Sequence, residues 1–284
     1  RIAISANERI AEFLDSAIQA KVAYVNKLRR DFVSTYPKAR MWWVVNTIFS
    51  EKAWATVWQY RATFLNGLLN TLESAVVGLA IAMVIGFALG LMAAGGRRAL
   101  RVIARIYVEF FQNTPLILQV CFLYYALAYS GVKISVVVVG FIALGFYHGA
   151  YVAEVVRAGI QAVPYGQFDA AWSQGFGYIE TMKTIILPQT IKIILPPMVN
   201  QVVALIKNTS CLFIIGGADL IATTYNFVTG ESTGGAYGPA YLVGGLLFFA
   251  VCYPLSLMAA RWEGRLKARD RVSVEAIEEK EATA

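Results

Sequence analysis

The stretch PYGQFDAAWSQGFGYIETMKTIILP, residues Pro164–Pro188, lies between two strongly apolar segments, yet it is polar on one side and interrupted by glycine. Pro164 and Gly166 predict a turn that ends the preceding helix. Apolar side chains then recur three to four positions apart, as one face of a short helix requires, at Phe168, Ala171 and Trp172. Asp169 falls near the start of that helix, where a carboxylate is favourable to the helix dipole.

Two glycines, Gly175 and Gly177, predict the end of this short helix. A second apolar stripe follows them and leads through Leu187 and Pro188 into the next apolar segment; its members are Ile179, Met182, Ile185 and Ile186. The stretch therefore predicts two short helices at the surface of a membrane, joined through a glycine turn.

The composition predicts an all-α integral membrane protein. Of the 284 residues 58% are hydrophobic and only 15% are charged, whereas soluble domains are nearer to about half apolar and about a quarter charged. The net charge of +7 fits the excess of Lys and Arg in cytoplasmic loops better than binding to nucleic acid. The three cysteines form no CxxC or Cys/His cluster, so neither a disulfide framework nor a metal site is predicted.

Five segments are long and apolar enough to span a bilayer, which takes about 20 residues. They are approximately 64–94, 101–129, 134–162, 185–215 and 235–260, within a domain that we place at 61–268. Lys and Arg gather in the loop after the first segment and again after the last segment. This pattern predicts that the loop after the first segment, the 164–188 loop and the C-terminus are all cytoplasmic. Residues 269–284 are predicted to be a flexible tail.

Residues 1–60 form an amphipathic and interfacial extension in this interpretation. Apolar residues recur at helical spacing in 1–40, and four tryptophans, which favour the membrane interface, lie in 41–60. The basic end of residues 1–40 conflicts with the orientation of the five spans, which requires the residues just before the first span to lie outside. Either 41–60 is a sixth span or the basic helix lies outside, and Glu51 and Lys52, costly at mid-membrane depth, favour the second alternative.

The loop resembles the cytoplasmic "EAA" loop of permease subunits of bacterial ATP-binding-cassette importers. The pattern reads Asp169-Ala170-Ala171, three residues, Gly175, and then Ile185-Ile186-Leu187-Pro188. Four further stretches narrow the resemblance to the polar amino acid uptake subfamily: FLNGLLNTL at 64–72, EFFQNTPL at 109–116, HGAYVAEVVRAGI at 148–160 and IKNTS at 206–210. The resemblance covers about 56–268 and implies the five-span core of a type I importer permease.

In this family the loop helix docks into a groove on the ATPase subunit. The resemblance assigns that contact to Gly166, Phe168, Asp169, Ala170, Ala171, Trp172, Gly175, Leu187 and Pro188. Small alanines permit close approach of a partner, and large aromatic side chains often anchor interfaces. Asp169 is one methylene shorter than the Glu of the family pattern, which favours a groove fitted to this subunit and hence a heterodimeric pore. The alternative is an amphipathic helix that lies on lipid.

No GxxxxGK[ST] loop occurs in the sequence, so ATP and Mg²⁺ are expected on a separate ATPase, and this chain is expected to bind no cofactor and to carry no catalytic residue. The resemblance implies a permease subunit that moves polar amino acids across the bacterial inner membrane. Its implied partners are an ATPase dimer, a second permease subunit and an extracellular substrate-binding protein. Two other functions compete with this one, a stand-alone secondary transporter and a membrane scaffold or enzyme.

Two intramembrane clusters are candidate linings of a substrate path, because ionisable groups within a span usually face the bundle or a water-filled route. In the third span, polar residues recur every three positions at His148, Tyr151, Glu154 and Arg157. They are interpreted as a lining for a zwitterionic amino acid. The competing interpretation is a structural Glu154–Arg157 pair.

The second cluster joins Lys207, Asn208 and Thr209 of the fourth span to Asn113, Thr114 and Pro115 of the second. Pro115 removes a backbone donor and leaves a carbonyl near Phe111 without its partner. Open backbone groups at membrane depth are tolerated where they line a cavity. The competing interpretation is a proline kink satisfied by Asn and Thr, with Lys207 reaching to the membrane surface.

Overall fold

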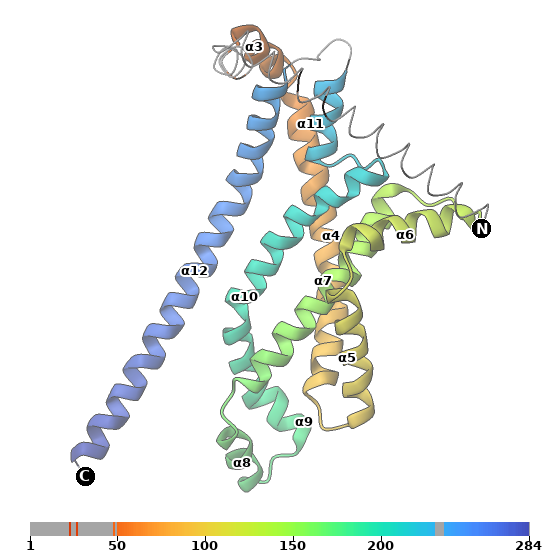
Figure 1. Ribbon diagram of the computed structural model, residues 1–284. Helices are drawn as coiled ribbons and strands as arrows, with labels where there is room; N and C mark the ends of the chain where they lie inside the picture. The colour runs from red at the N-terminus through yellow and green to blue at the C-terminus, as the bar shows by residue number, and fades with distance from the viewer. Residues whose placement is uncertain (1–22, 24–26, 28–47, 49, 231–235, 284) are drawn as a thin grey trace.

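The computed structural model describes residues 23, 27, 48, 50–230 and 236–283, and side chains as far as residue 266. Within these ranges the regular structure is helical (Figure 1). The elements are α3 (Glu51–Gln59), α4 (Arg61–Ala94), α5 (Arg98–Gln112), α6 (Leu116–Tyr129), α7 (Val136–Gln161), α8 (Gly166–Ser173), α9 (Tyr178–Thr181), the π-helix η1 (Met182–Ile186), α10 (Leu187–Asn208), the 3₁₀-helix η2 (Thr209–Ile215), α11 (Leu220–Thr229) and α12 (Tyr237–Thr283).

Four helical stretches of the described chain are long and apolar enough to cross a membrane: Arg61–Ala94, Val136–Gln161, Tyr178–Ile215 and Tyr237–Leu266. A fifth crossing is reached if α5 and α6 are counted as one span. The prediction of an all-α membrane protein with a core of about five spans is therefore confirmed. At 1.5 Å per residue, the 34 residues of α4 reach about 51 Å, which exceeds the hydrocarbon thickness of a bilayer.

The second predicted span is not one helix. Its two halves, α5 and α6, meet at an angle of 97° across Asn113–Pro115. Leu116 and Val120 of α6 are buried in a cluster with Leu144 of α7 and Leu212 of η2, and this packing holds α6 across the bundle. The continuous span expected at 101–129 is therefore replaced by a broken one.

The core is built on the seam between α4 and α7. Glycines of α4 lie directly under valines of α7, so that a Cβ on Gly86 would lie 2.3 Å from Val152 Cγ1 and one on Gly90 would lie 2.6 Å from Val156 Cβ. Only glycine permits so close an approach of two helices. Small residues at helix interfaces are the usual means of tight packing between membrane helices, where lipid supplies no hydrophobic drive for association.

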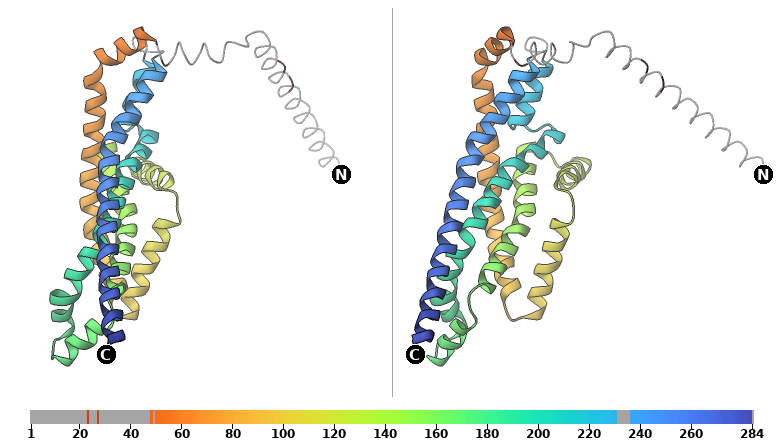
Figure 2. Two further views of the ribbon diagram at one scale, coloured as in Figure 1. Left: turned by 90° about the vertical axis from the view of Figure 1, so that its left-hand side faces the viewer. Right: turned by 60° about the vertical axis from the view of Figure 1, so that its left-hand side comes forward.

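The elements sort to the two ends of the bundle. The α4–α5 turn, α8, α9 and the C-terminus lie at one end, and α3 and α11 lie at the other (Figures 1 and 2). This grouping is the one that alternating membrane crossings require. α3 is a separate nine-residue helix, too short to span a bilayer by itself; most of the predicted amphipathic extension at 1–60 lies outside the described residues.

Two local expectations differ from the structure. α7 ends at Gln161, before Pro164, and Gly166 begins α8 instead of ending the helix before it. α12 continues to Thr283, so residues 275–283, the acidic end of the predicted 269–284 tail, are helical. The Glu and Ala residues of this segment are strong helix formers, which outweighs its lack of large apolar side chains.

Candidate functional site

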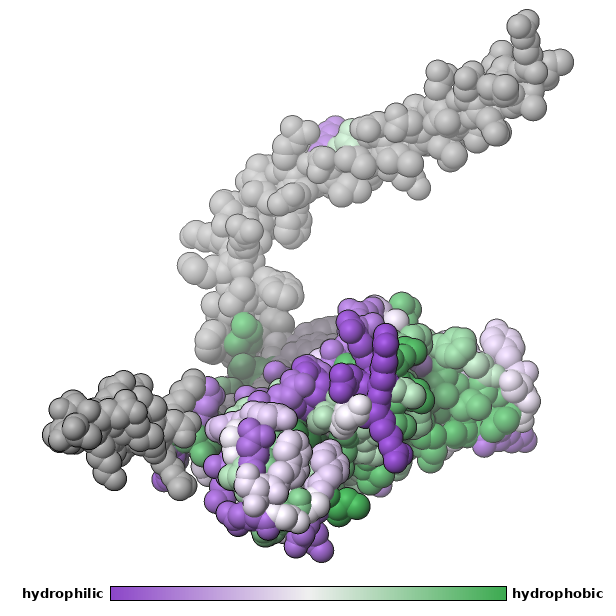
Figure 3. Space-filling model, turned by 90° about the horizontal axis from the view of Figure 1, so that it is seen from below, coloured by the Kyte–Doolittle hydropathy of each residue, from purple (hydrophilic) through white to green (hydrophobic). Residues whose placement is uncertain are grey.

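Helix α8 carries the predicted docking residues between two membrane-spanning segments. Asp169 lies in its first turn and is exposed, as the helix dipole favours. Seen from the end that carries α8, hydrophilic side chains gather over the near surface and apolar ones lie toward the sides (Figure 3). α8 is thus presented to a water-facing surface.

Gly175 ends α8 in a Schellman motif. Its N–H donates to Trp172 O at 2.9 Å, and the N–H of Phe176 donates to Ala171 O at 3.1 Å. Gly175 has φ +85°, a backbone conformation that side chains with a Cβ rarely adopt. Gly177, by contrast, has φ −73° and caps α9. The predicted glycine turn is confirmed, and its conformational requirement rests on Gly175.

The faces of α8 are divided between the chain's own core and solvent. Ala171 is 1% exposed, so its small side chain permits close approach to the rest of this chain and is not accessible to a partner. Phe168 packs against the core cluster that holds Met182 and Ile186. Trp172 is 44% exposed. The expectation that Ala171 faces the partner is therefore wrong.

Sequence reasoning missed Tyr165, which precedes α8 and is 66% exposed. Its ring stacks on Phe168 with centroids 5.9 Å apart and meets Trp172 edge-on at 6.1 Å. The spacing 165, 168, 172 repeats every three to four residues and is the signal that would have found it. Tyr165, Phe168 and Trp172 make an aromatic cluster, named the α8 aromatic cluster below, in which Tyr165 and Trp172 are exposed and Phe168 packs on the core.

At the α5–α6 break, side chains satisfy the freed backbone groups. Asn113 Nδ2 donates to Glu109 O at 2.7 Å and Thr114 Oγ1 donates to Phe110 O at 2.9 Å. Phe111 O, the carbonyl expected to lose its partner, accepts from Gln119 Nε2 at 3.2 Å. Pro115 precedes α6. The geometry matches the structural interpretation of Asn113–Pro115, and Gln119 is the residue that sequence reasoning missed.

His148 and Asn208 meet between α7 and the end of α10. Asn208 Nδ2 lies 3.1 Å from His148 Nε2, and His148 is 2% exposed. His148 Nδ1 has no hydrogen-bond partner among the described residues. The neighbouring Tyr151 hydroxyl lies 3.1 Å from that of Tyr147, and both rings contact the imidazole. Asn208 thus contacts His148 of the first predicted cluster, a pairing that the sequence did not predict.

The two neighbours of Asn208 in the second predicted cluster, Lys207 and Thr209, do not join this contact. Thr209, the first residue of η2, is fully buried and donates to Ile206 O of α10 at 2.8 Å. Lys207 is exposed on a different side of α10 from the partly buried Asn208. Among the described residues no hydrogen bond joins 113–115 to 207–209, so the two predicted halves of this cluster do not form one polar site.

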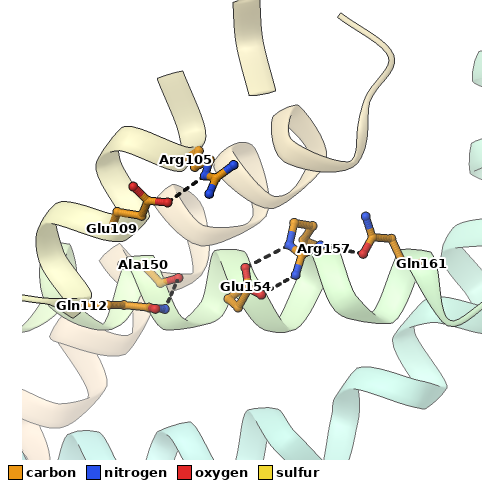
Figure 4. A network of polar contacts seen from close by, with 7 residues as sticks. All are labelled: Arg105, Glu109, Gln112, Ala150, Glu154, Arg157 and Gln161. Atoms are coloured by element: carbon orange, nitrogen blue, oxygen red, sulfur yellow. Dashed lines mark hydrogen bonds and ion pairs between the residues drawn. The ribbon is translucent and has the colours of Figure 1, made fainter. Parts of the chain in front are cut away.

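Glu154 and Arg157 form the predicted ion pair. Arg157 Nε donates to Glu154 Oε2 at 2.9 Å, its Nη2 bonds the other carboxylate oxygen, and its Nη1 donates to Gln161 Oε1 at 2.5 Å. The side chains are 44% and 32% exposed, respectively. On α5, opposite them, Arg105 Nε lies 2.7 Å from Glu109 Oε1 (Figure 4).

These two ion pairs line a cavity of about 560 Å³ between α4, α5 and α7. Arg101 and Gln112 also line it, and Gln112 Nε2 reaches Ala150 O at 3.4 Å. α5 and α7 run in opposite directions (Figure 1), with Arg before Glu on α5 and Glu before Arg on α7. Each carboxylate is paired with the arginine of its own helix, so the cavity is lined by two acidic and two basic groups.

The chain is similar to known membrane transport proteins over most of its length. A family model described as "Binding-protein-dependent transport system inner membrane component" matches residues 86–268. The probable glutamine ABC transporter permease GlnM of Bacillus subtilis is 36% identical over 204 residues, which cover 72% of this chain and 93% of the relative. A putative glutamine transport permease of Rickettsia felis is 40% identical over 171 residues, covering 57% and 78%.

Solved structures agree with this match. A crystal structure of an amino acid ABC transporter with histidines superposes with a TM-score of 0.68 at 30% identity, covering 75% of this chain and 98% of that one. The MetNI methionine ABC transporter superposes with a TM-score of 0.59 at 14% identity, covering 70% and 96%, and shares the fold. The chain therefore belongs to the family of binding-protein-dependent transport system inner membrane components.

Proposed function

We propose that this chain is the permease subunit of an importer that carries a polar amino acid across the inner membrane, driven by ATP hydrolysis on a separate subunit that docks at α8. Family membership and the names of the relatives support an amino acid as the cargo. No feature of the described residues favours a secondary transporter or a scaffold over this function.

The observation that carries the proposal is the presentation of α8. A short helix between two spans is held at the polar end of the bundle by a Schellman turn, and it exposes Tyr165 and Trp172 of the α8 aromatic cluster. Exposed Trp and Tyr side chains are the residue types that most often dominate binding energy at protein interfaces. An ATPase groove that accepts Trp172 and Tyr165 is the partner this surface fits, and α8 sets the cytoplasmic side, with the C-terminus on the same side.

A second permease subunit and a substrate-binding protein complete the proposed assembly. Only 11% of the apolar window of Tyr237–Leu266 is buried within this chain, which leaves much of α12 for lipid or a neighbouring subunit. The shorter acid at Asp169 keeps a related, non-identical subunit as our favoured partner. ATP and Mg²⁺ belong to the ATPase in this proposal.

The proposed substrate path runs through the cavity between α5 and α7. Arg105 and Arg157 would receive the carboxylate of an amino acid, and Glu109 and Glu154 its ammonium group. This adds Arg105 and Glu109 to the predicted residues Glu154 and Arg157. His148, Tyr151 and Asn208 are assigned a position on the far side of α7, where they join α7 to α10.

Reconstitution tests the function. The chain is co-expressed with its candidate ATPase and second permease gene products, purified through a tag on this chain, and placed in liposomes with the binding protein. We expect the ATPase to copurify with this chain. We also expect labelled glutamine, glutamate, histidine or arginine to enter the liposomes only when ATP is present on the side of the membrane that carries the ATPase. Uptake that follows a proton or sodium gradient without ATP would establish the secondary transporter instead.

A further inference from the structure

The helix that follows α8 changes its winding exactly where α8 rests on it. Between α9 and α10, the π-helix η1 pairs Leu187 N–H with Met182 O, five residues back. Pro188 follows, near the start of α10, where its missing N–H is tolerated. A π turn is wider than an α turn and is frequently found at functional sites.

α8 is seated on this π segment by apolar contact. Phe168 packs against the buried cluster that includes Met182 and Ile186, and Ile185 is packed against the same cluster. Apolar contact alone resists separation of the two elements but is non-directional. It therefore leaves the angle between α8 and α10 to be fixed by polar contacts.

Gln189 supplies a directional contact. Its Nε2 folds back one turn to donate to Ile185 O at 3.0 Å, and the same nitrogen lies 3.4 Å from Gln167 Oε1 on α8. One side-chain amide thus touches both the π segment and the candidate docking helix. The two glutamines are 22 residues apart in the chain.

Two buried hydroxyls flank the same segment. Thr181 Oγ1 and Thr190 Oγ1 lie in residues that are 0% and 1% exposed, and neither atom has a hydrogen-bond partner in the described part of the chain. Buried groups without partners raise the free energy of the arrangement that contains them. The segment against which α8 packs therefore contains two buried hydroxyl groups that lack hydrogen bonds.

We propose that Gln189 is a positioning residue for transport: through Gln167 it fixes the angle between α8 and the π-wound start of α10, so that displacement of α8 is passed to the membrane span. This inference rests on the proposed function, since it names the joint through which a docked ATPase would act. The Gln189 bond to Ile185 O orients the amide, and the Gln167 bond carries the link to α8.

The test measures the coupling ratio, labelled glutamine taken up per ATP hydrolysed, in the reconstituted complex of full-length chains. Gln189→Ala and Gln167→Ala are each expected to lower the ratio about threefold to tenfold, the size expected for one lost hydrogen bond. The double variant is expected to lose no more than the more impaired single variant, because the effects of two mutations within one hydrogen-bond network are not additive. ATPase copurification and the thermal midpoint should stay at the wild-type values in all three.

Gln59→Ala, at the exposed end of α3, is the matched control and should leave the ratio unchanged. If Gln189→Ala lowers the ratio and Gln167→Ala does not, Gln189 only completes the helix at Ile185, and the joint is overturned. Additive losses, or no loss in either variant, also overturn it. A wild-type complex that retains no ATPase and takes up no amino acid overturns the proposed function itself, a result distinct from the other three.

Discussion

Asn208 Nδ2 lies 3.1 Å from Nε2 of His148, and the bond joins α7 to the end of α10 across 60 residues of sequence. Removing Asn208 leaves the buried His148 Nε2 without a bond, which costs about 1–3 kcal/mol, and removing His148 leaves the partly buried amide of Asn208 without one. We expect His148→Ala and Asn208→Ala each to lower the thermal midpoint of the detergent-solubilised protein. Asn226→Ala, at an exposed position on α11, is the control and should not change it. Unaltered midpoints in both variants would contradict a structural bond here.

Gly175→Ala should weaken docking through the shape of the loop. A residue with a Cβ at φ +85° costs roughly 1–2 kcal/mol, so the Schellman turn opens and α8 loses its fixed end. The measurement is the amount of ATPase that copurifies, and Gly175→Asp should reduce it further. Gly177→Ala is a close control, because Gly177 has φ −73° and no atom within 4 Å of an added Cβ. Equal recovery of ATPase from all three variants would remove the turn from the docking mechanism.

Trp172→Ala should reduce ATPase binding directly. An exposed tryptophan that anchors an interface contributes on the order of 2–4 kcal/mol, a loss of about thirtyfold or more in affinity. Binding of the isolated ATPase to the permease in nanodiscs gives this value. Tyr129→Ala removes a 91% exposed aromatic from α6, away from α8, and should bind as the unaltered protein does. A Trp172→Ala affinity within twofold of the original would assign the α8 aromatic cluster to lipid.

Glu154→Gln should reduce transport without unfolding the protein. The pair with Arg157 is partly exposed, so its loss changes stability by less than about 1 kcal/mol. If the carboxylate receives the ammonium group of the cargo, kcat/KM for uptake should fall by about tenfold, the size expected for a hydrogen bond to a charged group. Asn113→Ala removes only a bond to Glu109 O at the α5–α6 break. Comparing the two variants distinguishes an effect of the cavity from an effect of the break. Normal uptake kinetics with Glu154→Gln would exclude this cavity as the path.

Gly86→Val should prevent assembly of the helix core. Its Cβ would lie 2.3 Å from Val152 Cγ1, and overpacking of this kind costs about 1–3 kcal/mol or more. We expect poor recovery of folded protein, measured as the monodisperse fraction after solubilisation. Gly96→Ala adds a methyl where no atom lies within 4 Å and should be recovered normally. Good recovery of both would mean that the α4–α7 seam can open.

Much of the fold was predictable because hydropathy over 20 residues decides whether a segment can span a bilayer. The positions of α4, α7, α10 and α12 follow from it. The 97° break did not follow, because Pro115 predicts only the loss of one backbone donor. The angle itself is set by the packing of Leu116 and Val120 against α7 and η2, which are distant in sequence.

The substrate path shows a different limit. His148 and Glu154 are six residues apart, which is about 240° around a helix at 100° per residue, so regular spacing by three cannot keep both on one face. The structure accordingly sends His148 toward Asn208 and Glu154 toward the α5 cavity. Arg105 and Glu109 both lie in the predicted second span, 101–129, and only the antiparallel approach of α5 and α7 places them in one cavity with Glu154.

The glycine seam has a consequence for movement. Valines of α7 that fill the spaces above Gly86 and Gly90 cannot slide past the neighbouring side chains without first separating the helices, and packed interfaces of this kind change between discrete arrangements instead of deforming gradually. α4 and α7 are thus expected to stay together as a stationary frame throughout a transport cycle. Opening to either side of the membrane must then come from displacement of the other helices relative to that frame.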